Sequence, residues 1–130
     1  MIQNKAPFEN EYVKYWIKDG VIHVQYKDNL VMTVAIAKQI VRDRLAYCEG
    51  INYLGLADIR MLKHVDHDAM RFMASKEAYE GVSKVAIYSN STMSKWLFNI
   101  WTLFDKPVKP TKYFTDLGAA YLYLKEISAN

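Results

Sequence analysis

The sequence is poor in the residues on which several classes of protein depend. Cys48 is its one cysteine, so no disulfide can form within the chain. Its five glycines form neither a glycine-rich phosphate-binding loop nor the Gly-x-Ser-x-Gly turn of a serine hydrolase. No apolar run approaches the roughly 18 residues of a membrane-spanning helix, and the first residues lack the apolar core of a signal peptide. We therefore expect a cytoplasmic protein that makes no membrane contact.

The charge of the chain is nearly balanced. Seventeen basic and fourteen acidic residues give a formal net charge of +3 at pH 7, which is too small a surplus to indicate nucleic-acid binding. Hydrophobic residues make up 52% and charged residues 24% of the 130 residues, a balance typical of a globular domain. We expect a loosely ordered lead-in at residues 1–10 and a single domain over residues 11–128.

An antiparallel hairpin is predicted over residues 11–27. Asp19-Gly20 is a two-residue turn signal, because both positions of a type I′ turn need a positive φ. Pairing outward from this turn places Ile17 opposite Ile22, and alternation along each strand sorts the side chains into two faces. The apolar face carries Val13, Tyr15, Ile17, Ile22, Val24 and Tyr26. The polar face carries Lys14, Trp16, Lys18, His23 and Gln25.

A helix is predicted to follow the hairpin. Thr33 is placed to cap it at the N-terminus, and Gly50 is placed to end it in a left-handed conformation. Apolar residues recur between them at helical spacing, which predicts one buried stripe. The stripe consists of Val34, Ala37, Val41, Leu45 and Cys48, widened by Ile36 and Ile40.

Strands and helices alternate in the rest of the chain. Apolar runs predict strands at 51–59, 83–89 and 112–115. Helices are expected to begin at Asp66, at Ser91 or Thr92, and at Asp116, since these side chains can cap a first turn. The resulting order, β-β-α-β-α-β-α-β-α, predicts an α/β fold in which helices pack on a single-layer mixed sheet that begins with the antiparallel hairpin.

Two stretches within this order resemble a known family. Residues 56–59 (LADI) followed by 65–70 (VDHDAM) resemble the strand, loop and helix start of STAS domains. Residues 109–116 (KPTKYFTD), followed by Ala120 and Leu124, resemble the closing strand and helix of bacterial STAS-like proteins. With the element order over residues 11–127, these stretches make the chain similar to the STAS domains of anti-sigma-factor antagonists. The architecture is also similar to that of CRAL-TRIO lipid-transfer domains.

The resemblance implies a binding module rather than an enzyme. In the antagonists, a partner kinase phosphorylates a serine at the start of the helix that begins here at Asp66. The corresponding positions are His67 and Asp68, and neither side chain carries a hydroxyl group. Asp68 can partly imitate the charge of a phosphate near a helix N-terminus. The resemblance therefore implies a partner- or ligand-binding role without the usual phosphorylatable serine.

Polar side chains that follow the predicted parallel strands form a candidate binding site. Ligands of open α/β sheets favour the crevice beyond the carboxyl ends of the strands. The candidates there are Asp58, Arg60, His64, His67, Asp68, Ser89, Asn90, Ser91 and Thr92. The alternative is that Asp58 and Arg60 pair with each other, while Ser91 or Thr92 caps a helix.

The histidines and the cysteine do not indicate a cofactor or a catalytic centre. His64 and His67 lie near carboxylates, but Zn²⁺ requires three or four ligands in fixed geometry. Cys48 is expected at the C-terminal end of a helix, where the helix dipole opposes a thiolate. We expect no metal and no cofactor, and a buried, unreactive cysteine.

Residues 94–104 of the helix predicted to begin at Ser91 or Thr92 are unusually rich in aromatic side chains, since they include Trp96 and Trp101. Its apolar arc is wider than one sheet face requires, which leaves three interpretations. The aromatic residues can belong to the core, form a surface for a protein partner or a second copy, or line a lipid-sized pocket. We expect a non-enzymatic regulatory module that binds a protein partner or forms a homodimer. The alternative is a carrier of a small apolar ligand or lipid.

Overall fold

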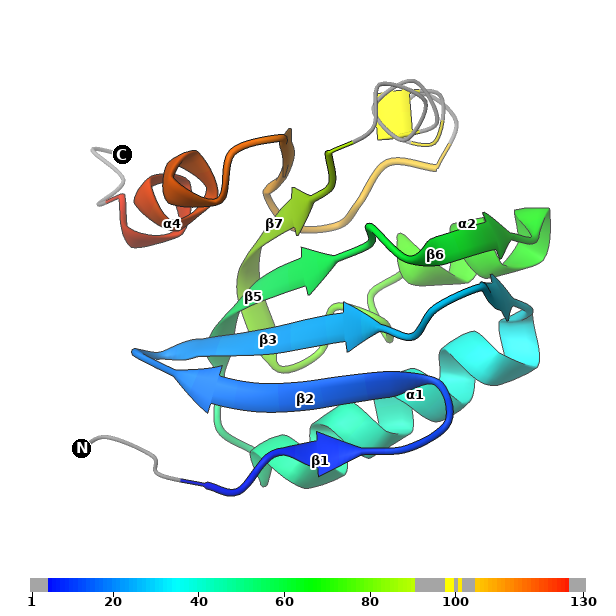
Figure 1. The fold of residues 1–130 in the computed structure, drawn as a ribbon, viewed down its shortest axis with the longest axis horizontal. Helices are drawn as coiled ribbons and strands as arrows, with labels where there is room; N and C mark the ends of the chain where they lie inside the picture. Colours follow the sequence, from blue (N-terminus) through cyan, green and yellow to red (C-terminus); the bar gives the residue numbers. More distant parts are fainter. Residues whose placement is uncertain (1–4, 91–97, 100, 102–104, 127–130) are drawn as a thin grey trace.

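A six-stranded mixed sheet forms the centre of the computed structural model, which describes residues 5–90, 98–99, 101 and 105–126. The strand order is β1-β2-β3-β5-β7-β8 (Figure 1). The first three strands pair antiparallel, and every pairing from β3 to β8 is parallel. The strands are β1 (Phe8–Glu9), β2 (Val13–Lys18), β3 (Val21–Tyr26), β5 (Tyr53–Asp58), β7 (Val82–Tyr88) and β8 (Thr111–Phe114). The predicted mixed α/β fold is confirmed.

The β2–β3 hairpin has the predicted register. Ile17 pairs with Ile22, and Tyr15 pairs with Val24. Asp19 and Gly20 have φ values of 54° and 77°, the positive values that a type I′ turn requires. This register places Tyr15 and Ile22 on one face of the hairpin, and that face packs against a helix.

Helices cover both faces of the sheet. On one face lies α1 (Val34–Cys48), beside α2 (His67–Met73), and on the opposite face lies α4 (Leu117–Lys125) (Figure 1). The larger core lies under α1, where Ala37, Ile40 and Val41 are buried against the hairpin. A smaller core joins Val21, Leu56 and Ala86 to Ala120 and Leu124 of α4. Leu117, expected to face inward, is 40% exposed because it lies in the first turn, at the rim of this core.

The ends of α1 match the prediction at Thr33 and differ at Gly50. The Thr33 hydroxyl accepts a hydrogen bond from the Ile36 amide at 3.2 Å, which satisfies one free donor of the first turn. The left-handed residue that ends α1 is Glu49 (φ 52°), one position earlier than predicted. Gly50 also has a positive φ of 78°, so two left-handed residues in succession turn the chain toward β5.

Several short elements differ from the sequence prediction. The helix α2 ends at Met73, because the Ser75 amide and hydroxyl both donate to the Phe72 carbonyl and divert the chain into turns. The expected lead-in contains β1, and Phe8 of this strand stacks on Tyr15 at 5.6 Å. Two further strands, β4 (Leu30–Met32) and β6 (Leu62–Val65), pair in parallel with each other as a separate two-stranded sheet. The predicted helix at 91–104 lies largely outside the described residues, of which Phe98, Asn99 and Trp101 are helical.

The N-caps of α2 and α4 provide a matched pair of substitutions. The Asp116 carboxylate accepts from the Ala119 amide at 2.8 Å, whereas Asp66, in the same position before α2, makes no capping hydrogen bond. The predicted cap at Asp66 is therefore wrong, because this side chain turns toward His64 instead, at 3.5 Å. We expect Asp116→Ala to cost about 1 kcal/mol of unfolding free energy and Asp66→Ala a few tenths. Urea denaturation measures both, and equal losses would contradict this assignment of the caps.

His23 attaches α4 to the hairpin. Its ring stacks on Trp16 at 4.9 Å, and its Nδ1 donates to the Val21 carbonyl at 3.2 Å. Its Nε2 then accepts from the Tyr121 hydroxyl of α4 at 2.6 Å. Trp16 is half-buried against this histidine. The polar face of the hairpin thus contributes a contact to α4.

We expect the stability to fall on acidification partly through His23. Burial lowers the pKa of His23 below its ordinary value of 6.5, so the unfolded chain binds a proton that the folded chain does not. The stability that neutral His23 contributes is complete above about pH 6.5 and is lost as the pH falls through the pKa of His23 in the folded protein. Urea denaturation at about pH 7.5 and about pH 5 measures how much unfolding free energy is lost between the two pH values. This loss should be smaller for His23→Gln than for the unsubstituted protein. Equal losses in the two proteins would contradict this role of His23.

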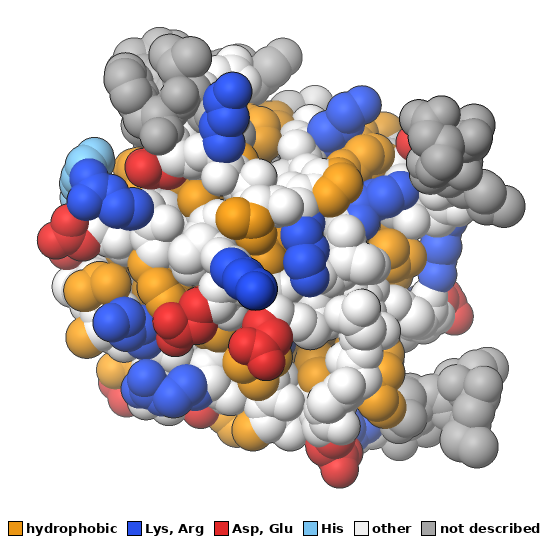
Figure 2. All heavy atoms as spheres, turned by 180° about the vertical axis from the view of Figure 1, so that it is seen from behind, with side chains coloured by type: hydrophobic (Ala, Val, Ile, Leu, Met, Phe, Trp, Pro, Cys, Tyr) orange, Lys and Arg blue, Asp and Glu red, His pale blue; other side chains and the backbone are white. Residues whose placement is uncertain are grey.

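Charged side chains are mixed with apolar ones on the face of the molecule shown in Figure 2. Lysine and arginine side chains spread over this face, with acidic and hydrophobic side chains between them. Spread in this way, the small positive surplus does not form the basic stripe that nucleic-acid binding requires on that face.

Candidate functional site

The face of the sheet that α1 and α2 cover bears three small or branched apolar side chains side by side. Val24 of β3 pairs with Ala57 of β5, and Ala57 pairs with Ile87 of β7. Because neighbouring residues in register point to the same face of a sheet, these side chains form a continuous apolar floor. All three lie beneath a cavity of about 270 Å³.

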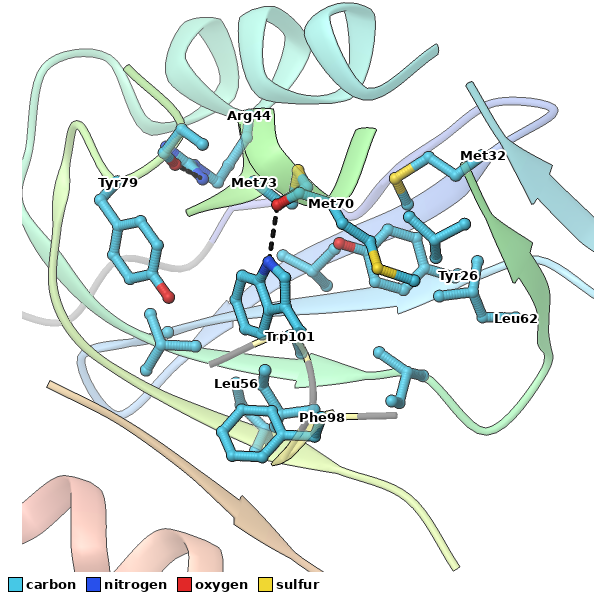
Figure 3. Close-up of a pocket in the computed structure, with 18 of the residues that line it drawn as sticks. Tyr26, Met32, Arg44, Leu56, Leu62, Met70, Met73, Tyr79, Phe98 and Trp101 are labelled. Atoms are coloured by element: carbon cyan, nitrogen blue, oxygen red, sulfur yellow. Dashed lines mark hydrogen bonds between the residues drawn. The ribbon is translucent and has the colours of Figure 1, made fainter. Parts of the chain in front are cut away.

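Flexible and aromatic side chains surround the cavity above this floor. Met32 of β4 and both Met70 and Met73 of α2 line it, together with Phe98 and Trp101 (Figure 3). The cavity exceeds the roughly 150 Å³ that accommodates benzene in an engineered apolar void, and approaches the size of small-ligand pockets. Methionine side chains adapt to ligands of irregular shape, because they are unbranched and polarizable.

Trp101 is held in place by the end of α2. Its indole Nε1 donates to the Met70 carbonyl at 2.6 Å, a carbonyl in the last turn of α2, where fewer backbone amides are available as donors. Its ring packs against Phe98 with centroids 5.8 Å apart, and Phe98 packs on Tyr113 of β8 at 5.7 Å. The aromatic wall is thus joined both to α2 and to the edge of the sheet.

Polar groups reach the cavity at the side of α1. Arg44 lines it and is only 8% exposed, and its Nη1 donates to the Ala78 carbonyl at 3.1 Å. Burial raises the pKa of Tyr26 and of Tyr79 to about 12, so both phenols remain protonated at neutral pH. The Tyr79 hydroxyl lies 2.6 Å from the Thr111 hydroxyl. The walls are thus largely apolar, with the buried Arg44 and two neutral hydroxyl groups on this side and the exposed Lys63 and His64 at the side of β6.

Asp58 and Arg60 pair with each other, which is the alternative that the sequence analysis left open. The Arg60 Nε and Nη2 donate to the two Asp58 carboxylate oxygens at 3.0 and 2.7 Å. The guanidinium also lies over the Tyr88 ring, 5.0 Å from its centroid. Because this pair already engages both charges at the carboxyl end of β5, it offers little to a ligand there.

His64, His67 and Asp68 lie at the entry to α2 and are exposed. With Asp66 they line a shallow hollow that shares Val65 and Met70 with the cavity. Within the described part of the chain, no group of three or more histidine, cysteine or acidic side chains is placed to hold a metal ion. His64 also belongs to the lining of the cavity, whereas His67 and Asp68 line only the hollow beside it.

The remaining predicted site residues divide between the core and the undescribed segment. Ser89 is fully buried directly after β7, and its amide donates to the Phe114 carbonyl at 3.1 Å. Ser91 and Trp96 lie outside the described residues, as does Thr92. Of the predicted set, Trp101 and His64 line the cavity, and His64 does so from an exposed position. Cys48 is buried as expected, and burial raises the pKa of its thiol.

The sequence analysis missed most of the cavity. Val24 lies on the predicted apolar face of the hairpin and Ala57 in a predicted strand, but such spacing does not distinguish a filled face from a hollow one. Arg44 was the available signal. It lies one helical turn from Ile40 and from Cys48 on the buried face of α1, where an arginine is unexpected.

Comparison with known proteins defines the class of fold. The solved structure of an uncharacterised DUF3478-family protein from Shewanella loihica PV-4, described as having a SpoIIAA-like fold, superimposes with a TM-score of 0.58. The match covers 90% of this chain and 98% of that chain at 15% sequence identity. The resemblance to STAS domains is thus confirmed at the level of the fold, and the chain is a SpoIIAA-like α/β protein.

The chain belongs to the family defined by the domain of unknown function DUF7793, whose family model matches residues 15–128. No curated protein matches the sequence. In the described part of the chain, every helix is too short or too polar to cross a membrane.

Proposed function

We propose that this protein is a non-enzymatic binding module that holds a small, largely apolar molecule in the cavity between its sheet and α2. The observation that carries the proposal is the cavity of about 270 Å³, with its floor of Val24, Ala57 and Ile87. Such a hollow is unusual beside a well-packed core, and apolar cavities of this kind bind apolar molecules.

The arrangement of the walls supports a ligand rather than a packing defect. The floor is rigid, because it belongs to three hydrogen-bonded strands. The opposite side carries Met70 and Met73, whose side chains can adjust to the occupant. A rigid floor and an adaptable roof suit a module that accepts one class of apolar molecule.

A regulatory role through a protein partner or a second copy is a second proposal. It is supported by Leu122 of α4, a large apolar side chain that is 75% exposed. The exposed His67 and Asp68 at the start of α2 would form a separate contact edge on the other face of the sheet. The two proposals are compatible, since α4 lies on the face of the sheet opposite to α2 (Figure 1). The cavity lies on the α2 side, where Met70 and Met73 line it.

The first proposal is tested with an uncharged apolar probe, 1-octanol. We expect a dissociation constant of roughly 0.1 mM, which corresponds to about 5–6 kcal/mol and is reasonable for a molecule of this size. Titration calorimetry at two temperatures should also show a negative heat-capacity change, because apolar surface is buried on binding. Native mass spectrometry of the purified protein checks for a ligand that is already bound. An empty protein that gives no binding heat up to about 1 mM probe would refute the proposal.

A further inference from the structure

Two side chains with a permanent positive charge line the cavity, the exposed Lys63 of β6 and the buried Arg44 of α1, and Arg44 is the one held in the interior. The side chain is 8% exposed, and its guanidinium donates to the carbonyls of Ala78 and Glu80. These two carbonyls occupy two of the five N–H groups of the guanidinium. The remaining donors belong to a side chain that lines the cavity.

No carboxylate among the described residues lies within ion-pairing distance of Arg44. Glu80 is exposed, and its carboxylate acts on Arg44 only from a greater distance. A buried cation without a paired anion is costly, and burial lowers the pKa of Arg44 although the group stays charged. The interior therefore favours an anion beside this side chain.

Tyr26 provides a second group in the same region. It is 5% exposed, and its hydroxyl makes no hydrogen bond with any residue that the structure describes. Figure 3 shows this hydroxyl pointing into the cavity, toward the side on which Trp101 lies. The charge of Arg44 also acts on Tyr26 and opposes the increase in its pKa that burial causes. The two groups thus present a cation and a neutral O–H donor to the same apolar space.

We propose that the natural ligand is a small amphipathic carboxylate, whose carboxylate accepts hydrogen bonds from Arg44 and Tyr26 while its apolar body lies on Val24, Ala57 and Ile87. This inference rests on the proposed function and specifies the ligand class of the same site. A guanidinium is suited to a carboxylate, because the two planar groups form charge-assisted hydrogen bonds.

The test compares octanoate with 1-octanol, two probes of equal chain length, by calorimetry at about pH 7.4, where octanoate is ionised. A purely apolar cavity would prefer the alcohol, because an ionised carboxylate must lose its water. A site that contains Arg44 reverses this order. We expect octanoate to bind about tenfold more tightly than 1-octanol.

Two substitutions identify the groups responsible. Arg44→Met should lower octanoate affinity about 30-fold and leave 1-octanol affinity within about threefold. Tyr26→Phe should lower octanoate affinity about fivefold. Tyr26→Phe keeps the aromatic ring, so it remains informative if Arg44→Met fails to fold. Arg42→Met is the matched control, since Arg42 is exposed on the same helix and bonds Gln39, and it should leave both affinities unchanged.

The outcomes separate this inference from the proposed function. Preference for octanoate that disappears in Arg44→Met, or weakens in Tyr26→Phe, supports the inference. Binding of 1-octanol that equals or exceeds that of octanoate overturns the inference and leaves the apolar binding function in place. Binding of neither probe overturns both.

Discussion

Ala57→Phe is expected to abolish binding of apolar probes while leaving the fold intact. Ala57 lies between Val24 and Ile87 on the cavity floor, so a phenyl ring at this position projects into the space that a ligand would occupy. The ring meets a hollow rather than packed atoms, so the cost in unfolding free energy should stay below about 1.5 kcal/mol. The affinity for 1-octanol should fall by more than about tenfold in calorimetric titrations.

The neighbouring strand offers a matched control on the opposite face of the sheet. Ala86 pairs with Leu56, is fully buried, and packs against Ala120 and Leu124 of α4. Because Ala86 is fully enclosed by these side chains, Ala86→Phe should overpack that core and cost about 1–3 kcal/mol or more. If the two substitutions destabilise the protein equally, or if Ala57→Phe binds 1-octanol normally, the floor of the cavity is wrongly assigned.

Tyr15→Ala is expected to give the largest loss of stability in the hairpin core. Tyr15 is fully buried, stacks on Phe8 at 5.6 Å, and donates from its hydroxyl to the Ile40 carbonyl of α1 at 2.5 Å. Removing the ring leaves a cavity between β2 and α1 and should cost about 3–5 kcal/mol of unfolding free energy. A domain of this kind has a total stability of about 5–15 kcal/mol, so the variant should be close to unfolding at 25 °C.

Tyr15→Phe separates the ring from the hydroxyl. It retains the packing and loses only the hydrogen bond to α1, which should cost about 1 kcal/mol. Urea denaturation followed by circular dichroism measures both variants. A loss below about 1.5 kcal/mol for Tyr15→Ala would show that α1 does not depend on this contact.

The regular elements were predictable because their signals are local. The turn at Asp19-Gly20 and the alternation around it admit only one register, since a slip of one residue would expose Tyr15 and bury Lys14. Thr33 and Asp116 cap their helices as predicted. By contrast, β4 and β6 have three and four residues, too few for a periodic pattern, and they form only because each pairs with the other.

The candidate site was less predictable. A cavity arises where side chains leave a space unfilled, and the sequence pattern does not show where that happens. The polar residues at the strand ends were visible in the sequence, but Asp58 and Arg60 neutralise each other. The residues that line the hollow carry the same pattern as a filled core, so their spacing could not separate a pocket from ordinary packing. Arg44 breaks that pattern, and the proposed preference of the cavity for a carboxylate depends on it.

The most direct test of the account observes the methionine methyl groups by NMR while 1-octanol is added to the ¹³C-methyl-labelled protein. Met32, Met70 and Met73 line the cavity, whereas Met61 is 48% exposed and lies outside it. The account predicts saturable shifts at Met32, Met70 and Met73 and none at Met61, with resonances assigned from single Met→Leu variants. Absence of shifts at the three cavity methionines at saturating probe, or shifts at Met61 alone, would contradict it.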